Sequence, residues 1–357
     1  MNSAESFSGS YGEARAKFLA AAKEAGAHLD RALNPERGPD GGDLSTDVAW
    51  FGPRDADRVL VMISGTHGVE GYCGSGAQVD WLRRGELMRV PKGTAVMMIH
   101  AINPYGFAWN RRVTEENVDL NRNWVDFGKP LPANARYSDL QEQICPRRWD
   151  DAAQAESTGA LLAYAQKHGM PALQQALSGG QYTHPAGIFF GGNGPTWSRQ
   201  TQSGLFRTYL GGASRVAIID YHTGLGPWGF SEQIVPDATQ LKRAATWYGA
   251  IVTSPSGGTS TSADIAGDGL SAAQGLLPQA EVTGMAMEVG TLPLLEVLHA
   301  LRSDAWLHAH GDLRSTQGLA IKKLIRAAFY GDADDWKGMV AGQSLVATRQ
   351  ALAGLQR

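Results

Sequence analysis

The sequence predicts an α/β fold, in which a mixed, mostly parallel sheet is flanked by helices within a single domain. Two apolar runs without polar alternation, Arg58 to Ser64 and Thr94 to His100, are typical of interior strands covered on both faces. A helical segment over 76–87 separates them, which is the order of a parallel crossover unit. No internal repeat or low-complexity linker divides the 357 residues, so we expect one domain over 1–357.

The other elements follow from the spacing of apolar residues. Apolar side chains recur at helical spacing from about 11 to 33, before Asn34-Pro35, and predict an N-terminal packing helix. The catalytic core is expected over about 44–330. Further strands are expected at Leu44 to Phe51, Ile188 to Phe190, Arg215 to Tyr221 and Gly284 to Val289, and further helices over 150–177, 198–209, 293–310 and 316–330.

Composition favours a cytoplasmic protein that acts on a small molecule. A hydrophobic content of 43% is enough for a large core, and a net charge of -3 without a long basic run offers no footprint for nucleic acid or an anionic membrane. We find neither an exported leader nor an apolar stretch long enough to span a bilayer. Only Cys73 and Cys145 are present, which fits a reducing compartment. Nothing in the sequence fixes the oligomeric state.

The stretch Ser64 to Cys73, SGTHGVEGYC, is the first candidate site because it joins a predicted strand to a predicted helix. His67 and Glu70 stand three apart in it, and an imidazole with a carboxylate at that spacing is half of a zinc site. A catalytic zinc needs a third protein ligand and an open position for water. We expect the third ligand to be His222, where another apolar run meets a glycine-rich loop.

The stretch Ala101 to Asp126 is polar, aromatic and long for a connector, as functional loops often are. It holds Arg112, Asp119, Asn121 and Arg122 within eleven positions, and a guanidinium beside an amide is suited to bind a carboxylate. Three other charged residues of the stretch are expected to be solvated: Arg111, Glu115 and Glu116.

Together these motifs resemble the M14 zinc carboxypeptidases, and within them a less characterised bacterial branch known as a domain of unknown function, DUF2817-like. Their order and rough spacing agree with that family over about two thirds of the chain. The motifs are H-x-x-E (His67, Glu70), V-D-L-N-R-N-W (Val118 to Trp124), I-D-Y-H-T-G (His222) and M-E-V-G-T (Glu288).

The resemblance implies a role for each matching residue. His67, Glu70 and His222 would bind one Zn²⁺ per chain, and Asp119 would orient a ligand histidine. Glu288 would act as the general base, with zinc acidifying the attacking water. The remaining roles concern the substrate: Arg112 would polarise the scissile carbonyl, while Asn121 and Arg122 would hold its terminal carboxylate.

The sequence departs from the family's peptidases in two places. Those enzymes place a mobile tyrosine over the substrate, and no local motif assigns one among Tyr182, Tyr221 and Tyr248. The loop 181–197 has no counterpart that we can place. The substrate's side chain is therefore not predicted.

We expect a zinc metallohydrolase that cleaves an amide bond next to a free carboxylate, most simply a metallocarboxypeptidase acting on small peptides. The first alternative is an N-acyl amino acid deacylase of the aspartoacylase and succinylglutamate desuccinylase type, which resembles the same fold and uses the same ligand set. A binding protein that has lost catalysis is a second alternative, against which the intact Glu288 argues. A dinucleotide site is disfavoured because Gly71, Gly74 and Gly76 lack the G-x-G-x-x-G register.

Overall fold

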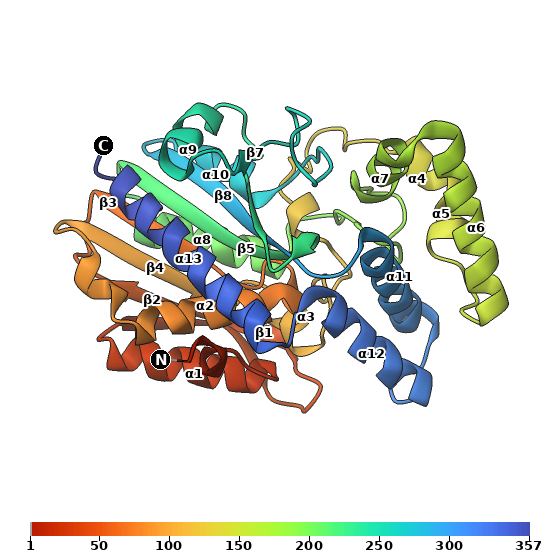
Figure 1. Cartoon of the computed structure of the whole chain (residues 1–357), viewed down its shortest axis with the longest axis horizontal. Helices are drawn as coiled ribbons and strands as arrows, with labels where there is room; N and C mark the ends of the chain where they lie inside the picture. Colours follow the sequence, from red (N-terminus) through yellow and green to blue (C-terminus); the bar gives the residue numbers. More distant parts are fainter. Residues whose placement is uncertain (1) are drawn as a thin grey trace.

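A computed structural model describes residues 2–357, and its strands form an eight-stranded sheet (Figure 1). The strand order is β1-β2-β4-β3-β5-β8-β6-β7. The strands are β1 (His28–Arg37), β2 (Asp43–Phe51), β3 (Arg58–Ile63), β4 (Thr94–His100), β5 (Arg215–Trp228), β6 (Ser231–Ile234), β7 (Val252–Thr253) and β8 (Glu281–Gly290). The helices are α1 (Tyr11–Glu24), α2 (Gly71–Arg83), α3 (Pro104–Ala108), α4 (Ala135–Asp139), α5 (Gln141–Ile144), α6 (Asp151–His168), α7 (Met170–Ser178), α8 (Trp197–Leu210), α9 (Leu241–Tyr248), α10 (Gly269–Leu276), α11 (Leu294–His310), α12 (Thr316–Phe329) and α13 (Asp334–Gly354).

The predicted mixed α/β fold with a mostly parallel sheet is confirmed. Four of the seven neighbouring strand pairs are parallel, and they include the three that join β4, β3, β5 and β8 in the middle. Parallel neighbours bring the carboxyl ends of their strands to one edge of the sheet, which is where α/β proteins build their sites.

The core lies on both faces of the sheet, as the unbroken apolar runs predicted. In β3, Leu60 and Met62 point to the face covered by α1, α2 and α13, whereas Val59, Val61 and Ile63 point to the face covered by α8 and α10. All five side chains are buried. A strand buried on both faces needs apolar residues at every position, so its pattern is continuous rather than alternating.

The predicted N-terminal helix over 11–33 is wrong in its second half. The helix α1 ends at Glu24, because Gly26 takes a left-handed backbone with φ of 78°, and the chain then enters the edge strand β1. Leu29 and Leu33, which suggested a helical face, are exposed on that strand. An edge strand rich in charged residues carries little apolar alternation, so its pattern resembles that of a solvated helix.

Other differences concern short or late elements. The expected strand at Ile188 to Phe190 is reduced to one bridge between Gln181 and Phe190. The strands β6 and β7 and the helix α13 had not been predicted, and α13 carries the fold beyond the expected core boundary at 330. The helix α13 packs on α2. The division into a single domain stays a prediction.

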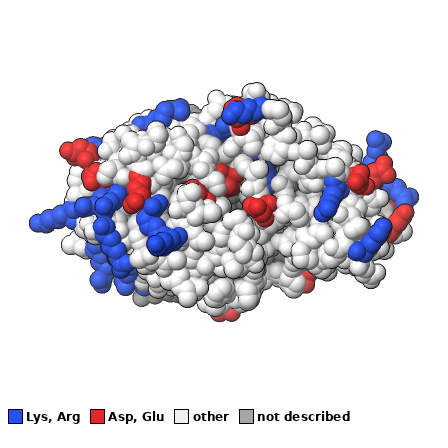
Figure 2. All heavy atoms as spheres, turned by 90° about the horizontal axis from the view of Figure 1, so that it is seen from above, with Lys and Arg blue, Asp and Glu red and all other residues white. Residues whose placement is uncertain are grey.

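The helices α4 to α7 and α11 lie beyond the ends of β5 and β8, at one end of the molecule (Figure 1). None of the helices in residues 2–357 is long and apolar enough to cross a membrane. Figure 2 shows a face on which acidic and basic side chains are scattered over a largely uncharged surface.

Candidate metal centre and active site

His67 and Glu70 lie in the turn between β3 and α2, where the chain is held close to the segment after α3. The backbone N–H groups of Gly68 and Val69 donate to the carbonyl oxygens of Arg112 and Arg111 at 3.0 and 2.8 Å. A Cβ atom on Gly68 would lie 2.0 Å from the backbone of Gly106, so only glycine permits this approach. The turn is therefore rigid, and both polar side chains are buried.

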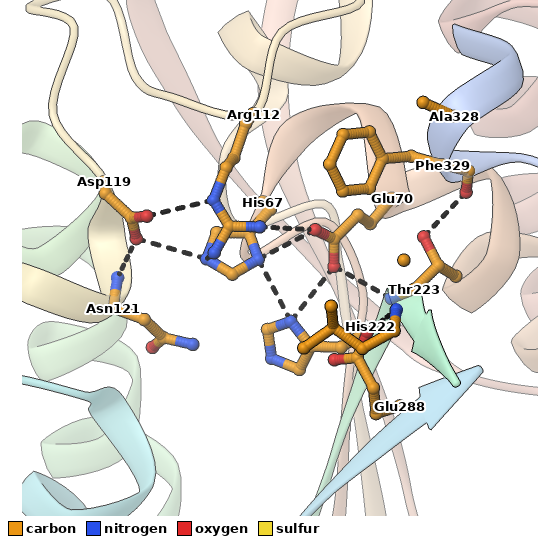
Figure 3. Close-up of polar contacts among 12 residues, drawn as sticks. His67, Glu70, Arg112, Asp119, Asn121, His222, Thr223, Glu288, Ala328 and Phe329 are labelled. Atoms are coloured by element: carbon orange, nitrogen blue, oxygen red, sulfur yellow. Dashed lines mark hydrogen bonds and ion pairs between the residues drawn. The ribbon is translucent and has the colours of Figure 1, made fainter. Parts of the chain in front are cut away.

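His222 joins them because β3 and β5 are parallel neighbours. The register pairs Ile63, the last residue of β3, with Asp220, so the turn after β3 lies beside the part of β5 that carries His222. His67, Glu70 and His222 form a buried group whose donor atoms all lie within 4.8 Å of one another. The Nδ1 atoms of the two histidines are 3.1 Å apart, and the Glu70 oxygens lie 3.0 Å from His67 Nδ1 and 3.1 Å from His222 Nδ1 (Figure 3).

This donor set fits a tetrahedral divalent ion. The Nε2 of His222 lies 2.9 Å from Asp220 Oδ2, and since a carboxylate can only accept, Nε2 donates and Nδ1 turns its lone pair toward the centre. A lone pair facing another imidazole nitrogen and a carboxylate needs a proton or a metal cation between them. Ligand atoms bound to one tetrahedral zinc at 2.0–2.1 Å are about 3.3 Å apart, close to the separations observed.

Charge holds the carboxylates of the centre ionised. Burial raises the pKa of Glu70, but His67, His222 and Arg112 outweigh it and bring the pKa below its usual range. Burial also raises the pKa of Asp119, but Arg112 and His67 outweigh this effect and hold that pKa well below its usual range. Burial lowers the pKa of His222, and the charges of Asp220 and Glu70 turn that shift into a strong rise. The carboxylates of the centre are therefore ionised, as a candidate metal ligand such as Glu70 has to be.

The family of the chain follows from its sequence as a whole. The family model described as "Protein of unknown function (DUF2817)" matches residues 7–343. The chain belongs to the DUF2817 family. No curated protein matches it.

Solved structures show that this DUF2817 protein has the zinc carboxypeptidase fold. Carboxypeptidase A from Helicoverpa armigera is 12% identical, with a TM-score of 0.51 over 98% of this chain and 75% of that chain. Bovine thrombin-activatable fibrinolysis inhibitor, solved in complex with tick carboxypeptidase inhibitor, is 9% identical, with a TM-score of 0.51 over 98% of this chain and 97% of that chain. At such low identity the likeness concerns the fold alone.

Glu288 lies beside the candidate metal centre of the DUF2817 chain, on the strand next to the one that carries His222. The β5–β8 register pairs the two residues directly. Its Oε1 accepts a hydrogen bond of 2.9 Å from the backbone N–H of Leu225. Burial and the charge of Glu70 raise the pKa of Glu288 to about 7, so this carboxyl can both take and give a proton near neutral pH.

Arg112 contacts the candidate ligands directly. It donates to Glu70 Oε1 at 2.9 Å and to Asp119 Oδ2 at 3.0 Å, and its Nη2 lies 2.8 Å from His67 Nε2 (Figure 3). Asp119 in turn lies 3.2 Å from that same Nε2. Arg112 therefore supports the ligands as well as lining the cavity beside them.

Asn121 and Arg122 line the same cavity as the metal centre. The Oδ1 of Asn121 accepts from the backbone N–H of Gly269 at 3.1 Å, which leaves its amide N–H groups as donors. The guanidinium of Arg122 donates to the carbonyl oxygens of Asn121 and Ser178, and its buried Nε has no hydrogen-bond partner. Both residues can therefore offer donors to an anion.

The tyrosines do not line the cavity. Tyr182 donates to the carbonyl oxygen of Arg122, Tyr221 contacts Ser344, and Tyr248 is buried without a partner for its hydroxyl. Within residues 2–357 the lining of this cavity contains no tyrosine. The aromatic residues on its wall are instead Phe189, from the loop 181–197, and Phe329, the last residue of α12.

Sequence reasoning missed Asp220, Phe189 and the role of Arg111. Asp220 stands two before His222, a spacing that puts both side chains on one face of a strand, and this D-x-H pattern was the available signal. Phe189 has a φ of 54° and a ring 5.4 Å from the guanidinium carbons of both Arg112 and Arg122, and no sequence pattern announces such a position. Arg111 was expected to be solvated, but it is buried and paired with Asp304.

Proposed function

We propose that this protein is a zinc-dependent hydrolase that cleaves an amide bond next to a free carboxylate, most simply as a metallocarboxypeptidase that releases a C-terminal residue. The observation that carries the proposal is the buried His67, Glu70 and His222 group with Glu288 directly beside it. We propose that these three residues are the metal ligands. We also assign the protein to the cytoplasm, because its two cysteines are unpaired.

A zinc ion held by these ligands would supply Lewis acidity, which polarises a carbonyl oxygen and acidifies water. Glu288 takes a proton from the attacking water at its free oxygen, because Oε1 already accepts from Leu225, and passes that proton to the leaving amine. Arg112 stabilises the negative charge that develops on the carbonyl oxygen. Asn121 and Arg122 bind the carboxylate and so fix which amide bond faces the centre.

Metal analysis and one conservative variant test this mechanism. Protein purified without chelator is expected to hold about one zinc per chain, and alanine at His67 or His222 to abolish it. Glu288→Gln keeps the shape of the base, so zinc content should persist while turnover falls by about 10²–10⁴ or more. Full zinc occupancy in both histidine variants would exclude the proposed ligands. Loss of zinc from Glu288→Gln would make Glu288 a ligand rather than a base.

The carboxylate requirement is tested with paired substrates. N-blocked peptides with a free C-terminus should be cleaved, and their C-terminal amides should not, because the amide cannot pair with the guanidinium of Arg122. Arg122→Ala should remove the difference between the two. Equal cleavage of acids and amides by the unaltered protein would refute this carboxylate clamp, which is formed by Asn121 and Arg122.

A second candidate function is cleavage of N-acyl amino acids. It needs the same metal centre and the same carboxylate clamp. It is favoured by the largely apolar wall of the cavity and by the lack of a tyrosine among its described lining residues.

A further inference from the structure

Two helices give the cavity an apolar wall beyond the metal centre. On α7 the side chains that line it recur at helical spacing, so one face of the helix is turned toward the cavity. The first turns of α11 provide an apolar lining on another side, and both helices stand beyond the ends of β5 and β8 (Figure 1). The apolar lining includes Met170, Leu173 and Leu177 of α7 and Leu295, Leu298 and Leu301 of α11.

The wall runs from a buried base to an open mouth. Leu173, Leu177 and Leu301 are 2%, 4% and 8% exposed, whereas Met170 and Leu295 are 42% and 48% exposed. Large apolar side chains gathered at the open end of a cavity mark a surface that an apolar ligand covers.

The polar groups gather at one end of this wall. Arg122 donates to the carbonyl oxygen of Ser178, the last residue of α7, so the carboxylate clamp sits at the C-terminal end of that helix. Asp268 lines the cavity too, and the charge of Arg122 acts on its carboxyl. From Ser178 to Met170 the helix rises about 12 Å, which is the length of the apolar strip that leads away from the clamp.

A peptide chain would find few donors along this strip. The polar side chains on the wall are Gln174, Ser178 and Ser262, and each already donates to a carbonyl oxygen of the protein, at 2.8, 2.7 and 3.2 Å. A peptide lying there would bury its own C=O groups without partners, which costs free energy for each group. An alkyl chain has no such groups to satisfy, and burying it is favourable.

We infer that the substrate is an N-acyl amino acid with a long aliphatic acyl chain, whose carboxylate lies at Asn121 and Arg122 and whose chain covers the wall formed by α7 and α11. This inference deepens the second candidate function, cleavage of N-acyl amino acids, and rests on the proposed zinc-dependent hydrolase. The reaction breaks the amide C–N bond. Water gives its hydroxyl to the acyl carbon and its proton to the nitrogen, so the products are a fatty acid and a free amino acid.

The test compares chain lengths on the zinc-loaded protein. One panel of amino acids is acylated with acetyl, hexanoyl or decanoyl groups, and N-acetylated dipeptides form the peptide arm. We expect kcat/KM to rise by about fourfold for each added methylene, so that decanoyl compounds far exceed both the acetyl compounds and the dipeptides. Binding of the acetyl and decanoyl compounds to Glu288→Gln is measured in parallel by calorimetry.

Variants at exposed positions test whether the acyl chain binds to this wall. Leu295→Ser and Met170→Ser, both at exposed positions, should lower the ratio of decanoyl to acetyl cleavage. Leu319→Ser is the matched control, because Leu319 is 56% exposed on α12 and does not line the cavity, and it should leave the ratio unchanged.

The outcomes separate the inference from the function on which it rests. Cleavage that does not depend on chain length overturns the inference and keeps the hydrolase. Tighter binding of decanoyl than acetyl compounds by Glu288→Gln, without cleavage by the unaltered protein, upholds the ligand class and removes the hydrolase. Neither cleavage nor a preference in binding overturns both.

Discussion

Asp220 shows how a side chain outside the candidate ligand set can determine which nitrogen a histidine offers to the centre. Its Oδ2 accepts from His222 Nε2 at 2.9 Å, and its Oδ1 accepts from Thr66 Oγ1 at 2.8 Å. Both oxygens are thus fixed, and the imidazole is held in the tautomer that offers Nδ1 to the centre. We predict that Asp220→Ala lowers zinc affinity by about 10–100-fold, as measured by competition with a chromogenic chelator.

Asp139→Ala is the control for this variant, because Asp139 is an exposed residue of α4. It should bind zinc as the unaltered protein does. If Asp220→Ala also retains zinc with unchanged affinity, the tautomer of His222 is set by something other than this carboxylate.

The sequence could predict the chemical groups of the candidate site better than their supports. His67 and Glu70 follow the apolar strand β3, and His222 and Glu288 come after the apolar runs of β5 and β8. Because parallel strands meet at one edge, their gathering was predictable. Phe189 was not, because its place between two guanidinium groups depends on a left-handed backbone in a loop without repeating pattern.

At the scale of elements, Asp304 of α11 ties three segments together. It pairs with Arg111 of the loop after α3 at 3.0 Å and with Lys322 of α12. Burial raises the pKa of Asp304, but Lys322 and Arg111 outweigh it and lower the pKa to about 2. We predict that Asp304→Ala destabilises the protein by about 3–5 kcal/mol in urea unfolding, because the buried Arg111 and the partly buried Lys322 lose their partner.

A triple apolar variant provides the comparison. Replacing Asp304 by Leu together with Arg111 and Lys322 by Met removes all three charges at once. The free energy of unfolding should then fall much less than it does in Asp304→Ala. A single-variant loss below about 1 kcal/mol would mean that water reaches this cluster and screens it.

Elements were predictable where their burial pattern was simple. The strands β3 and β4 were found because both of their faces are buried, which makes their apolar runs continuous. The edge strand β1 was taken for helix because its side chains are largely exposed and carry no alternation. The strands β6 and β7 are only four and two residues long, too short to display a period.

For the whole molecule, buried His100 predicts acid sensitivity. It stacks on Phe18 at 4.6 Å, its Nε2 contacts Ser75 Oγ at 2.9 Å, and its Nδ1 has no partner. Burial lowers the pKa of His100 from 6.5 to about 4; of its charged neighbours, Asp47 opposes this shift and Arg15 adds to it. The unfolded chain therefore binds a proton between about pH 6.5 and 4 that the folded chain does not, and stability falls as pH falls through that window.

The loss attributable to His100 should reach about 3 kcal/mol at the acid end of the window, since one pKa unit corresponds to about 1.4 kcal/mol. Chemical unfolding at several pH values measures it. His100→Gln keeps a group at the Nε2 position but does not titrate, so its stability should depend less on pH. The control is His28→Gln on exposed β1, which should keep the slope of the unaltered protein. Equal slopes in all three proteins would refute the assignment.

The bond from Arg122 to the carbonyl oxygen of Ser178 has a thermodynamic consequence. The guanidinium that we propose to bind the substrate's carboxylate also holds the final turn of α7. Binding of the carboxylate and local opening of that helix therefore both depend on Arg122. Linkage is reciprocal: a ligand that prefers the arrangement with α7 in place makes the helix harder to open, and a loosened helix weakens the ligand. Amide hydrogen exchange should therefore slow in α7 when a saturating N-acyl amino acid is added to Glu288→Gln, whereas exchange in the distant α1 should stay unchanged.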